Sequence, residues 1–168
     1  VFLMWRNKAI SDTYEPGSVF KIFTAAAGLE EGVVSTDTTY NCTGSIKVAN
    51  YYQHCFNHHV HGVQTVAEAL PNSCNTFFIT MGQRMGKETF TKYFEAFGFT
   101  ETTGIDLPSE AVPVAGKTYY PVEKMGIAEL SSASFGQTFQ VSPIQMITAV
   151  ASLGNGGKLM TPYVVKQV

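Results

Sequence analysis

The chain has 168 residues, of which 45% are hydrophobic and 14% are charged, a composition typical of one folded domain with its own core. Its formal net charge of -2 and its isoelectric point near 6.1 give no electrostatic basis for binding nucleic acid or an anionic membrane, so we expect no nucleic-acid partner. No run of residues reaches the roughly 18 to 20 apolar positions that a membrane-spanning helix needs.

The first half of the chain predicts one long helix followed by a strand-rich connection. Apolar residues recur at helical spacing from Ser18 onward, and Gly32 supplies a C-terminal cap. Residues 33–64 have no helical period and are rich in Thr, Asn, Gly, Tyr and His. They predict loops and short strands, with a hairpin around 45–53. A short helix then begins with a capping box at Thr65.

The second half predicts three longer helices and one long connection. Two helices span about 75–85 and 87–98, and the second carries an aromatic stripe that we expect in the core. Residues 98–122 contain three prolines and predict an irregular connection. The last helix begins with a capping box at Ser142 and ends at Gly154. These elements predict a mostly helical α+β fold with no strong sheet of its own.

One serine stands at the predicted start of the first helix, in the segment EPGSVFK. Residues three apart share a helix face, so Ser18 and Lys21 should be neighbours. A lysine kept neutral by burial can take the proton of a serine, and a helix N-terminus offers free N–H groups to an oxyanion. The pattern suits acyl transfer, although about 0.6 matches to S-x-x-K are expected by chance and a capped helix with a solvated lysine also explains it.

A second pattern, S-x-N, occurs in the sequence SCN, between two predicted helices. It consists of Ser73, Cys74 and Asn75, with the cysteine in place of an aspartate. The motifs S-x-x-K, S-D-N and K-T-G together mark the serine penicillin-recognising enzymes. This chain has the first motif and, after it, the second with a cysteine in the middle position. The two patterns in this order favour a nucleophilic serine over a helix cap.

With both motifs in view, the chain resembles the transpeptidase domain of class B penicillin-binding proteins along nearly all of its length. The similar segments are RNKAISDTYEPGSVFK, HGVQTVAEALPNSCNTFF, FGFTETTGIDLPSE and SFGQTFQVSPIQMITAVASLGNGGKLMTPYVVKQV. The resemblance implies that residues 1–168 are a partial transpeptidase domain, the helical subdomain of the β-lactamase/transpeptidase-like fold, with most of the central sheet outside this chain. The third motif of the family, K-T-G, is missing, and KTY at 117–119 is out of order.

The resemblance also implies roles for the matched residues. Ser18 would attack the D-Ala-D-Ala carbonyl of a peptidoglycan stem peptide, with Lys21 as the general base. Ser73 would relay a proton to the departing amine, and Asn75 would bind the acyl side chain and Lys21. An amine of a neighbouring stem peptide would then take the acyl group, whereas β-lactams would leave Ser18 acylated. No cofactor would be required for catalysis.

The resemblance further implies an extracytoplasmic position at the bacterial membrane, an N-terminal membrane anchor and a glycan-polymerising membrane partner. Division, elongation and sporulation all stay open as the cellular process. Two other functions also stay open. A β-lactamase or β-lactam sensor shares the same motifs, and a non-catalytic binding or scaffold module, stabilised by zinc, gains weight from the missing K-T-G motif.

All four histidines cluster near two of the three cysteines. Cys42 and Cys55 could form a disulfide, or they could bind a structural zinc ion with His58, which completes a C-x-x-H pattern. Free thiols beside a solvated histidine loop are the third alternative. We assign His61 to the HG element of the family, as a structural residue, and Cys74 to packing.

Overall fold

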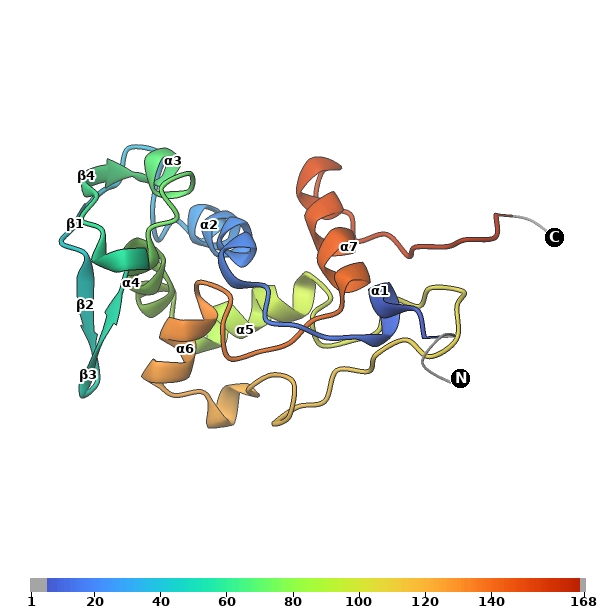
Figure 1. Cartoon of the computed structure of the whole chain (residues 1–168). Helices are drawn as coiled ribbons and strands as arrows, with labels where there is room; N and C mark the ends of the chain where they lie inside the picture. The colour runs from blue at the N-terminus through green and yellow to red at the C-terminus, as the bar shows by residue number, and fades with distance from the viewer. Residues whose placement is uncertain (1–5, 167–168) are drawn as a thin grey trace.

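The computed structural model describes residues 6–166 and confirms a mostly helical α+β architecture (Figure 1). The elements, in chain order, are α1 (Lys8–Ser11), the 3₁₀ turn η2 (Gly17–Phe20), α2 (Lys21–Glu30), β1 (Thr39–Cys42), β2 (Ser45–Val48), β3 (Tyr51–His54), η3 (Phe56–His58), β4 (Gly62–Thr65), α3 (Val66–Ala69), α4 (Asn75–Met85), α5 (Lys87–Ala96), η4 (Val122–Lys124), α6 (Ile127–Ala133) and α7 (Pro143–Gly154). Within this described range, no helix is long and apolar enough to cross a membrane.

The strands form two separate antiparallel pairs rather than one central sheet. β1 pairs with β4, with Cys42 opposite Gly62, and β2 pairs with β3, with Ser45 opposite His54. The second pair is the hairpin predicted around 45–53, which is therefore confirmed. Figure 1 shows the strands at one end of the molecule, beside α3 and α4 and far from both termini. This strand end of the molecule contains segments that contribute residues to the candidate site.

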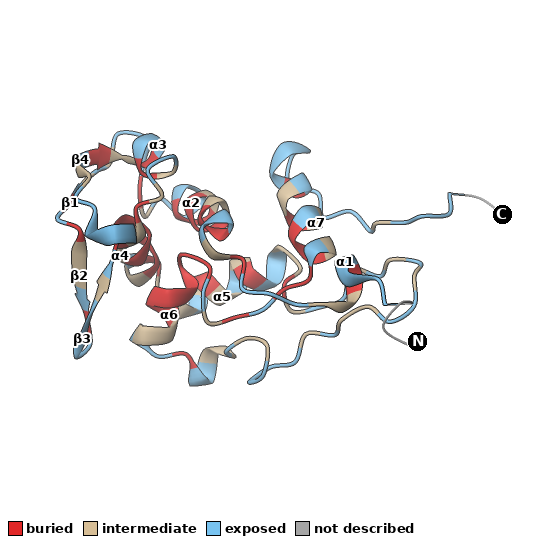
Figure 2. Ribbon diagram, in the orientation of Figure 1, coloured by how far each residue is buried: buried red, intermediate tan, exposed pale blue. Residues whose placement is uncertain are grey.

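The larger core cluster is built around Phe20, the last residue of η2. Its ring centroid lies 4.7 Å from that of Phe139 and 5.4 Å from that of Phe23. The rings of Phe90 and Phe94, on the predicted aromatic stripe of α5, each lie 6.0 Å away, so the prediction that this stripe belongs to the core is confirmed. Figure 2 shows buried residues gathered where α2, α4 and α6 face one another.

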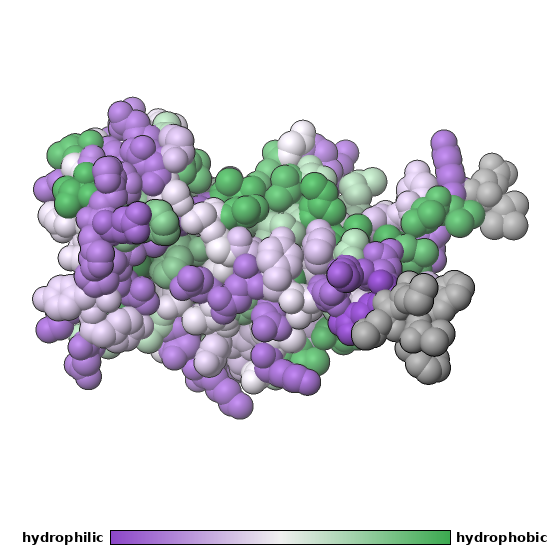
Figure 3. Space-filling model, in the orientation of Figure 1, coloured by the Kyte–Doolittle hydropathy of each residue, from purple (hydrophilic) through white to green (hydrophobic). Residues whose placement is uncertain are grey.

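The surface differs between the two ends of the molecule. On the face shown in Figure 3, hydrophobic side chains gather between α2 and α7, whereas the strand end is mostly hydrophilic. The exposed apolar residues on these two helices include Leu29 of α2 and Ile147 and Leu153 of α7. On this face the apolar surface is therefore concentrated between the two helices, whereas Phe56 and Val63 are exposed apolar residues of the strand end.

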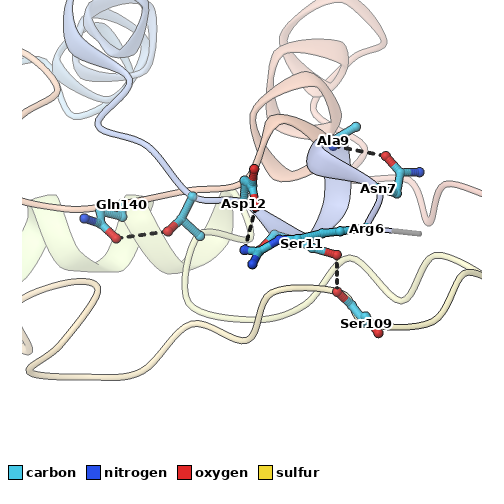
Figure 4. A network of polar contacts seen from close by, with 8 residues as sticks. Arg6, Asn7, Ala9, Ser11, Asp12, Ser109 and Gln140 are labelled. Atoms are coloured by element: carbon cyan, nitrogen blue, oxygen red, sulfur yellow. Dashed lines mark hydrogen bonds and ion pairs between the residues drawn. The ribbon is translucent and has the colours of Figure 1, made fainter. Parts of the chain in front are cut away.

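The segment that leads into η2 is fixed to two distant parts of the chain (Figure 4). The hydroxyl of Ser11 donates to the carbonyl oxygen of Ser109 at 2.7 Å. The hydroxyl of Thr13 donates to Oε1 of Gln140 at 2.9 Å. Because the two bonds join residues 98 and 127 positions apart, the chain that approaches Ser18 is held by two distant segments.

Helix α6 was not predicted, because its sequence is short and rich in serine. Serine usually disfavours a helix interior because its hydroxyl competes for backbone groups. Here the hydroxyl of Ser131 donates to the carbonyl of Ile127 at 2.6 Å, and that of Ser134 donates to Leu130 at 2.7 Å. The buried hydroxyls are thus satisfied within the helix, and tertiary packing on α4 supports the rest.

The predicted capping box at Thr65 is confirmed and gives a test of the local structure that precedes the S-x-N loop. Oε2 of Glu68 accepts from the N–H of Thr65 at 2.7 Å and from its hydroxyl at 2.9 Å. We expect Thr65→Ala to lower the free energy of unfolding by about 1 kcal/mol, the usual cost of a lost N-cap, as measured by urea denaturation. Thr65→Ser keeps the hydroxyl and should stay within about 0.5 kcal/mol of wild type. Equal losses in the two variants would contradict the capping role.

Candidate active site

Ser18 is an exposed residue in the single 3₁₀ turn that opens the first long helix. The N–H of Gly17 donates to the carbonyl oxygen of Gly136 at 2.8 Å, directly before the serine. Gly136 has a φ of +90°, and a Cβ at this position would lie 1.9 Å from the carbonyl oxygen of Gly17. A glycine is therefore required at 136 for the close approach that holds the serine turn in place.

Lys21 begins α2, one turn beyond Ser18, and is only 1% exposed. Its Nζ lies 3.0 Å from Oγ of Ser18, 2.9 Å from Oγ of Ser73 and 2.6 Å from Oδ1 of Asn75. It also donates to the carbonyl oxygen of Ser73 at 2.8 Å. The hydroxyl of Ser73 donates to Oγ of Ser18 at 2.8 Å. The structure thus brings together all four residues that the two motifs predicted.

The S-x-N loop, residues 73–75, has an unusual backbone conformation, which holds the side chains of Ser73 and Asn75. Ser73 has a φ of +49°, a left-handed conformation that costs about 1–3 kcal/mol in a residue other than glycine. The N–H of Ser73 donates to the carbonyl of Leu70 at 3.0 Å, and Asn75 begins α4. Nδ2 of Asn75 donates to the carbonyl oxygen of His54 at 2.9 Å. The end of β3 therefore orients the amide so that its oxygen faces Lys21. The contact between Asn75 and His54 is one that the sequence did not suggest.

Burial sets the protonation of Lys21. Removal of the ammonium from water lowers the pKa of Lys21 from 10.5 to about 8, and this exceeds the opposing effect of the Cys55 and Cys74 thiols. The four surrounding oxygens suit an ammonium group, which has three N–H donors. With a pKa near 8, a neutral amine is accessible close to physiological pH. Lys21 can then accept a proton from Ser18.

The two serine hydroxyls open on a surface pocket of about 490 Å³. Its lining comes from the serine turn, from the S-x-N loop and from the histidine-rich loop between β3 and β4: Ser18, Phe56, Asn57, His59, His61, Asn72 and Ser73. The phenylalanine is 82% exposed. A reacting group can therefore reach the Ser18 hydroxyl from this side while Lys21 stays buried.

The structure brings a different set of side chains together from the three metal ligands that the sequence predicted. Cys42 and Cys55 are free thiols whose Sγ atoms lie 3.7 Å apart, so they are neighbours as expected. His58 is not part of their cluster, and its ring centroid lies 4.2 Å from that of His54. His61, next to β4, takes its place with Nδ1 3.3 Å from the Cys42 sulfur, and Cys74 joins the group. From the sequence, His61 was assigned a structural role and Cys74 was assigned to packing, so neither was predicted to join this cluster.

The thiols of the cluster influence one another. Sγ of Cys74 lies 3.8 Å from Sγ of Cys55. A hydrogen bond from Cys74 lowers the pKa of Cys55, and the same bond together with burial raises the pKa of Cys74.

The arrangement of these side chains suits acyl transfer through a serine ester. It consists of an exposed serine, a buried lysine of lowered pKa and a second serine that contacts both. Comparison with known proteins agrees with this class. The family model described as the penicillin binding protein transpeptidase domain matches residues 3–168, so the chain belongs to this family. The family resemblance seen in the sequence is thereby confirmed.

The similarity extends to individual proteins and structures. Stage V sporulation protein D of Bacillus subtilis (strain 168) is 43% identical over 164 residues, which cover 96% of this chain and 25% of that protein. Peptidoglycan D,D-transpeptidase MrdA of Acinetobacter baumannii is 30% identical over 168 residues, which cover 95% and 25%. The structure of Pseudomonas aeruginosa PBP2 in complex with WCK 5153 has a TM-score of 0.87 at 25% identity and covers 97% of this chain and 39% of that one. The chain thus spans about a quarter of the length of the curated relatives it matches.

Proposed function

We propose that this chain carries the nucleophile and base of a peptidoglycan D,D-transpeptidase, which forms a serine ester on Ser18 with a D-Ala-D-Ala stem peptide. The observation that supports this most directly is the buried amine of Lys21, with Oγ of Ser18 at 3.0 Å and Oγ of Ser73 at 2.9 Å. Burial of the base and exposure of the nucleophile are what a serine needs to attack a bound carbonyl.

The first half of the proposed reaction forms the ester. Neutral Lys21 takes the Ser18 proton while Oγ bonds to the carbonyl carbon of the penultimate D-alanine. The N–H of Ser18 lies in the first helical turn, where backbone donors have no intrahelical acceptor, and is available to the oxyanion. Ser73, hydrogen-bonded to both residues, passes a proton to the leaving amine as the C–N bond breaks and D-alanine departs.

The second half transfers the acyl group. The amine of a neighbouring stem peptide attacks the ester carbonyl and loses a proton through the same hydroxyl and amine. The bond between the acyl carbon and Oγ of Ser18 breaks, Oγ regains its proton, and a new amide cross-link results. Asn75 would hold the acyl side chain with its amide while its oxygen keeps Lys21 in place. The reaction uses only side chains and backbone of the enzyme.

The names of the relatives support the substrate class and the cellular setting that we propose. MrdA of Acinetobacter baumannii is named a peptidoglycan D,D-transpeptidase, and the Bacillus subtilis relative is named for sporulation. A Helicobacter pylori PBP2 forms a complex with MreC. We propose that the parent protein acts on peptidoglycan at the extracytoplasmic face of a bacterial membrane, is inhibited by β-lactams and works with a glycan-polymerising partner. Sporulation is the process we favour.

Incubation with a fluorescent penicillin tests the proposal. We expect a covalent adduct on the peptide containing Ser18, located by mass spectrometry, that is lost in Ser18→Ala and kept in Ser35→Ala, a control at an exposed serine. The experiment uses the 168-residue chain and a form extended through the K-T-G strand that the family resemblance implies. An adduct that forms only in the extended protein would show that acylation of Ser18 requires the K-T-G strand. Absence of an adduct in both forms would contradict the enzyme and favour a binding module.

A further inference from the structure

Three cysteines and one histidine converge behind the S-x-N loop from four different places in the chain. Cys42 ends β1, Cys55 follows β3, His61 precedes β4 and Cys74 precedes α4. Within residues 6–166, the three sulfur atoms and one ring nitrogen all lie within 4.8 Å of one another. The transpeptidase reaction proposed above uses none of these four side chains.

Three of the six distances among these four atoms match the edges of a tetrahedron around a single ion. Sγ of Cys55 lies 3.7 Å from Sγ of Cys42 and 3.8 Å from Sγ of Cys74. Tetrahedral zinc with Zn–S bonds of about 2.3 Å places two sulfurs about 3.8 Å apart. Nδ1 of His61 lies 3.3 Å from Sγ of Cys42. The corresponding edge between a sulfur and a nitrogen ligand of zinc is about 3.5 Å.

The three cysteines of the cluster are buried, His61 is half-buried at the wall of the surface pocket, and the sulfur of Cys42 receives two hydrogen bonds. Cys42, Cys55 and Cys74 are 0%, 3% and 0% exposed. The hydroxyl of Thr76 donates to Sγ of Cys42 at 3.3 Å, and the N–H of Gly44 donates to the same atom at 3.4 Å. Donors of this kind orient and stabilise thiolate ligands, whereas an inert buried cysteine sits in apolar surroundings.

We propose that Cys42, Cys55, His61 and Cys74 bind one zinc ion in a closed structural site. Three thiolates and an imidazole are an established ligand set of structural zinc, and soft sulfur ligands select it over magnesium or calcium. Binding displaces the thiol protons and fills all four positions, so the ion has none left for a substrate. The site lies wholly within this chain and does not depend on the proposed function.

The ion fixes the loop that carries two residues of the candidate site. Cys74 stands between Ser73 and Asn75, and both of these contact Nζ of Lys21. A bond from Cys74 to the ion joins this loop to the strands that carry the other three ligands. Removal of the ion with a chelator is expected to lower the Tm and to increase hydrogen exchange at the amides of residues 72–76.

Metal content measured by plasma mass spectrometry tests the proposal directly. The 168-residue protein, purified anaerobically with reductant and zinc, is expected to hold about one zinc per chain. His61→Ala should lose most of this zinc, whereas His58→Ala should keep it, because His58 is an exposed member of the same histidine-rich loop and is not in the cluster. Less than about 0.1 zinc per chain in the wild type, or equal zinc in the two variants, overturns the proposal.

Cobalt provides a second test, which does not depend on the folding of any variant. Co²⁺ titrated into the metal-free wild-type chain should saturate at one equivalent and give the visible absorption of tetrahedral cobalt with sulfur-to-metal charge-transfer bands. Absence of these bands overturns the proposal. A disulfide between any two of the three cysteines in the anaerobically purified protein, seen as a mass lower by two hydrogens, overturns it as well.

Discussion

Lys21→Met is expected to slow acylation of Ser18 by a β-lactam about 10³-fold, because the serine loses its base. Methionine matches the buried lysine stem in length and carries no charge, so the packing around this 1% exposed position is kept. The measurement is the second-order rate constant of labelling in the form that the fluorescent penicillin acylates. Lys92→Met, at an exposed lysine paired with Glu31, is the matched control and should label at the wild-type rate.

The pKa of Lys21 predicts how the rate of acylation depends on pH. The neutral amine is the active form, and burial lowers the pKa of Lys21 to about 8. Below pH 8 the rate should therefore rise about tenfold per pH unit, and above it the rate should level off. Lys21→Arg keeps a permanent positive charge and should be slow at every pH. A wild-type rate that falls as pH rises through 8, or that is flat from pH 6 to 9, would remove Lys21 as the base.

The parts of the site that were predictable are those that depend on local sequence. Ser18 and Lys21 are neighbours because they are three residues apart at a helix start, and the capping boxes at Thr65 and Ser142 mark helix starts that the structure confirms. The contact of Lys21 with Ser73 joins residues 52 positions apart, which no local pattern specifies. That contact was expected only through the family resemblance.

The parts that were not predictable depend on how distant segments pair. His61 reaches Cys42 because β1 and β4 pair across an intervening hairpin, and the register of strands so far apart is not encoded in a short window. The spacing C-x-x-H pointed to His58 instead. Cys74 was assigned to packing, and its partners in the cluster lie 13, 19 and 32 positions upstream, beyond the reach of a local pattern. The local sequence pattern therefore predicted two members of the cluster, Cys42 and Cys55, but not His61 and Cys74.

The close approach of Gly136 to Gly17 makes a distant glycine part of the support of the turn that carries Ser18. Gly136 is buried in the loop after α6, and its carbonyl oxygen accepts the Gly17 N–H at 2.8 Å. A Cβ on Gly136 would lie 1.9 Å from the carbonyl oxygen of Gly17 and 2.8 Å from its nitrogen. These are backbone atoms, so the serine turn itself would have to move.

Gly136→Ala is therefore expected to lower the free energy of unfolding by at least about 3 kcal/mol and to reduce acylation of Ser18 in whatever protein still folds. Gly156→Ala separates backbone strain from the clash, because Gly156 has a similar φ of +81° with nothing within 4 Å of the added Cβ. Left-handed strain alone should cost this control about 1–2 kcal/mol and leave acylation unchanged. Urea denaturation and penicillin labelling of both variants measure the two effects. Similar losses of stability with unchanged labelling would show that the Gly136–Gly17 contact does not position the nucleophile.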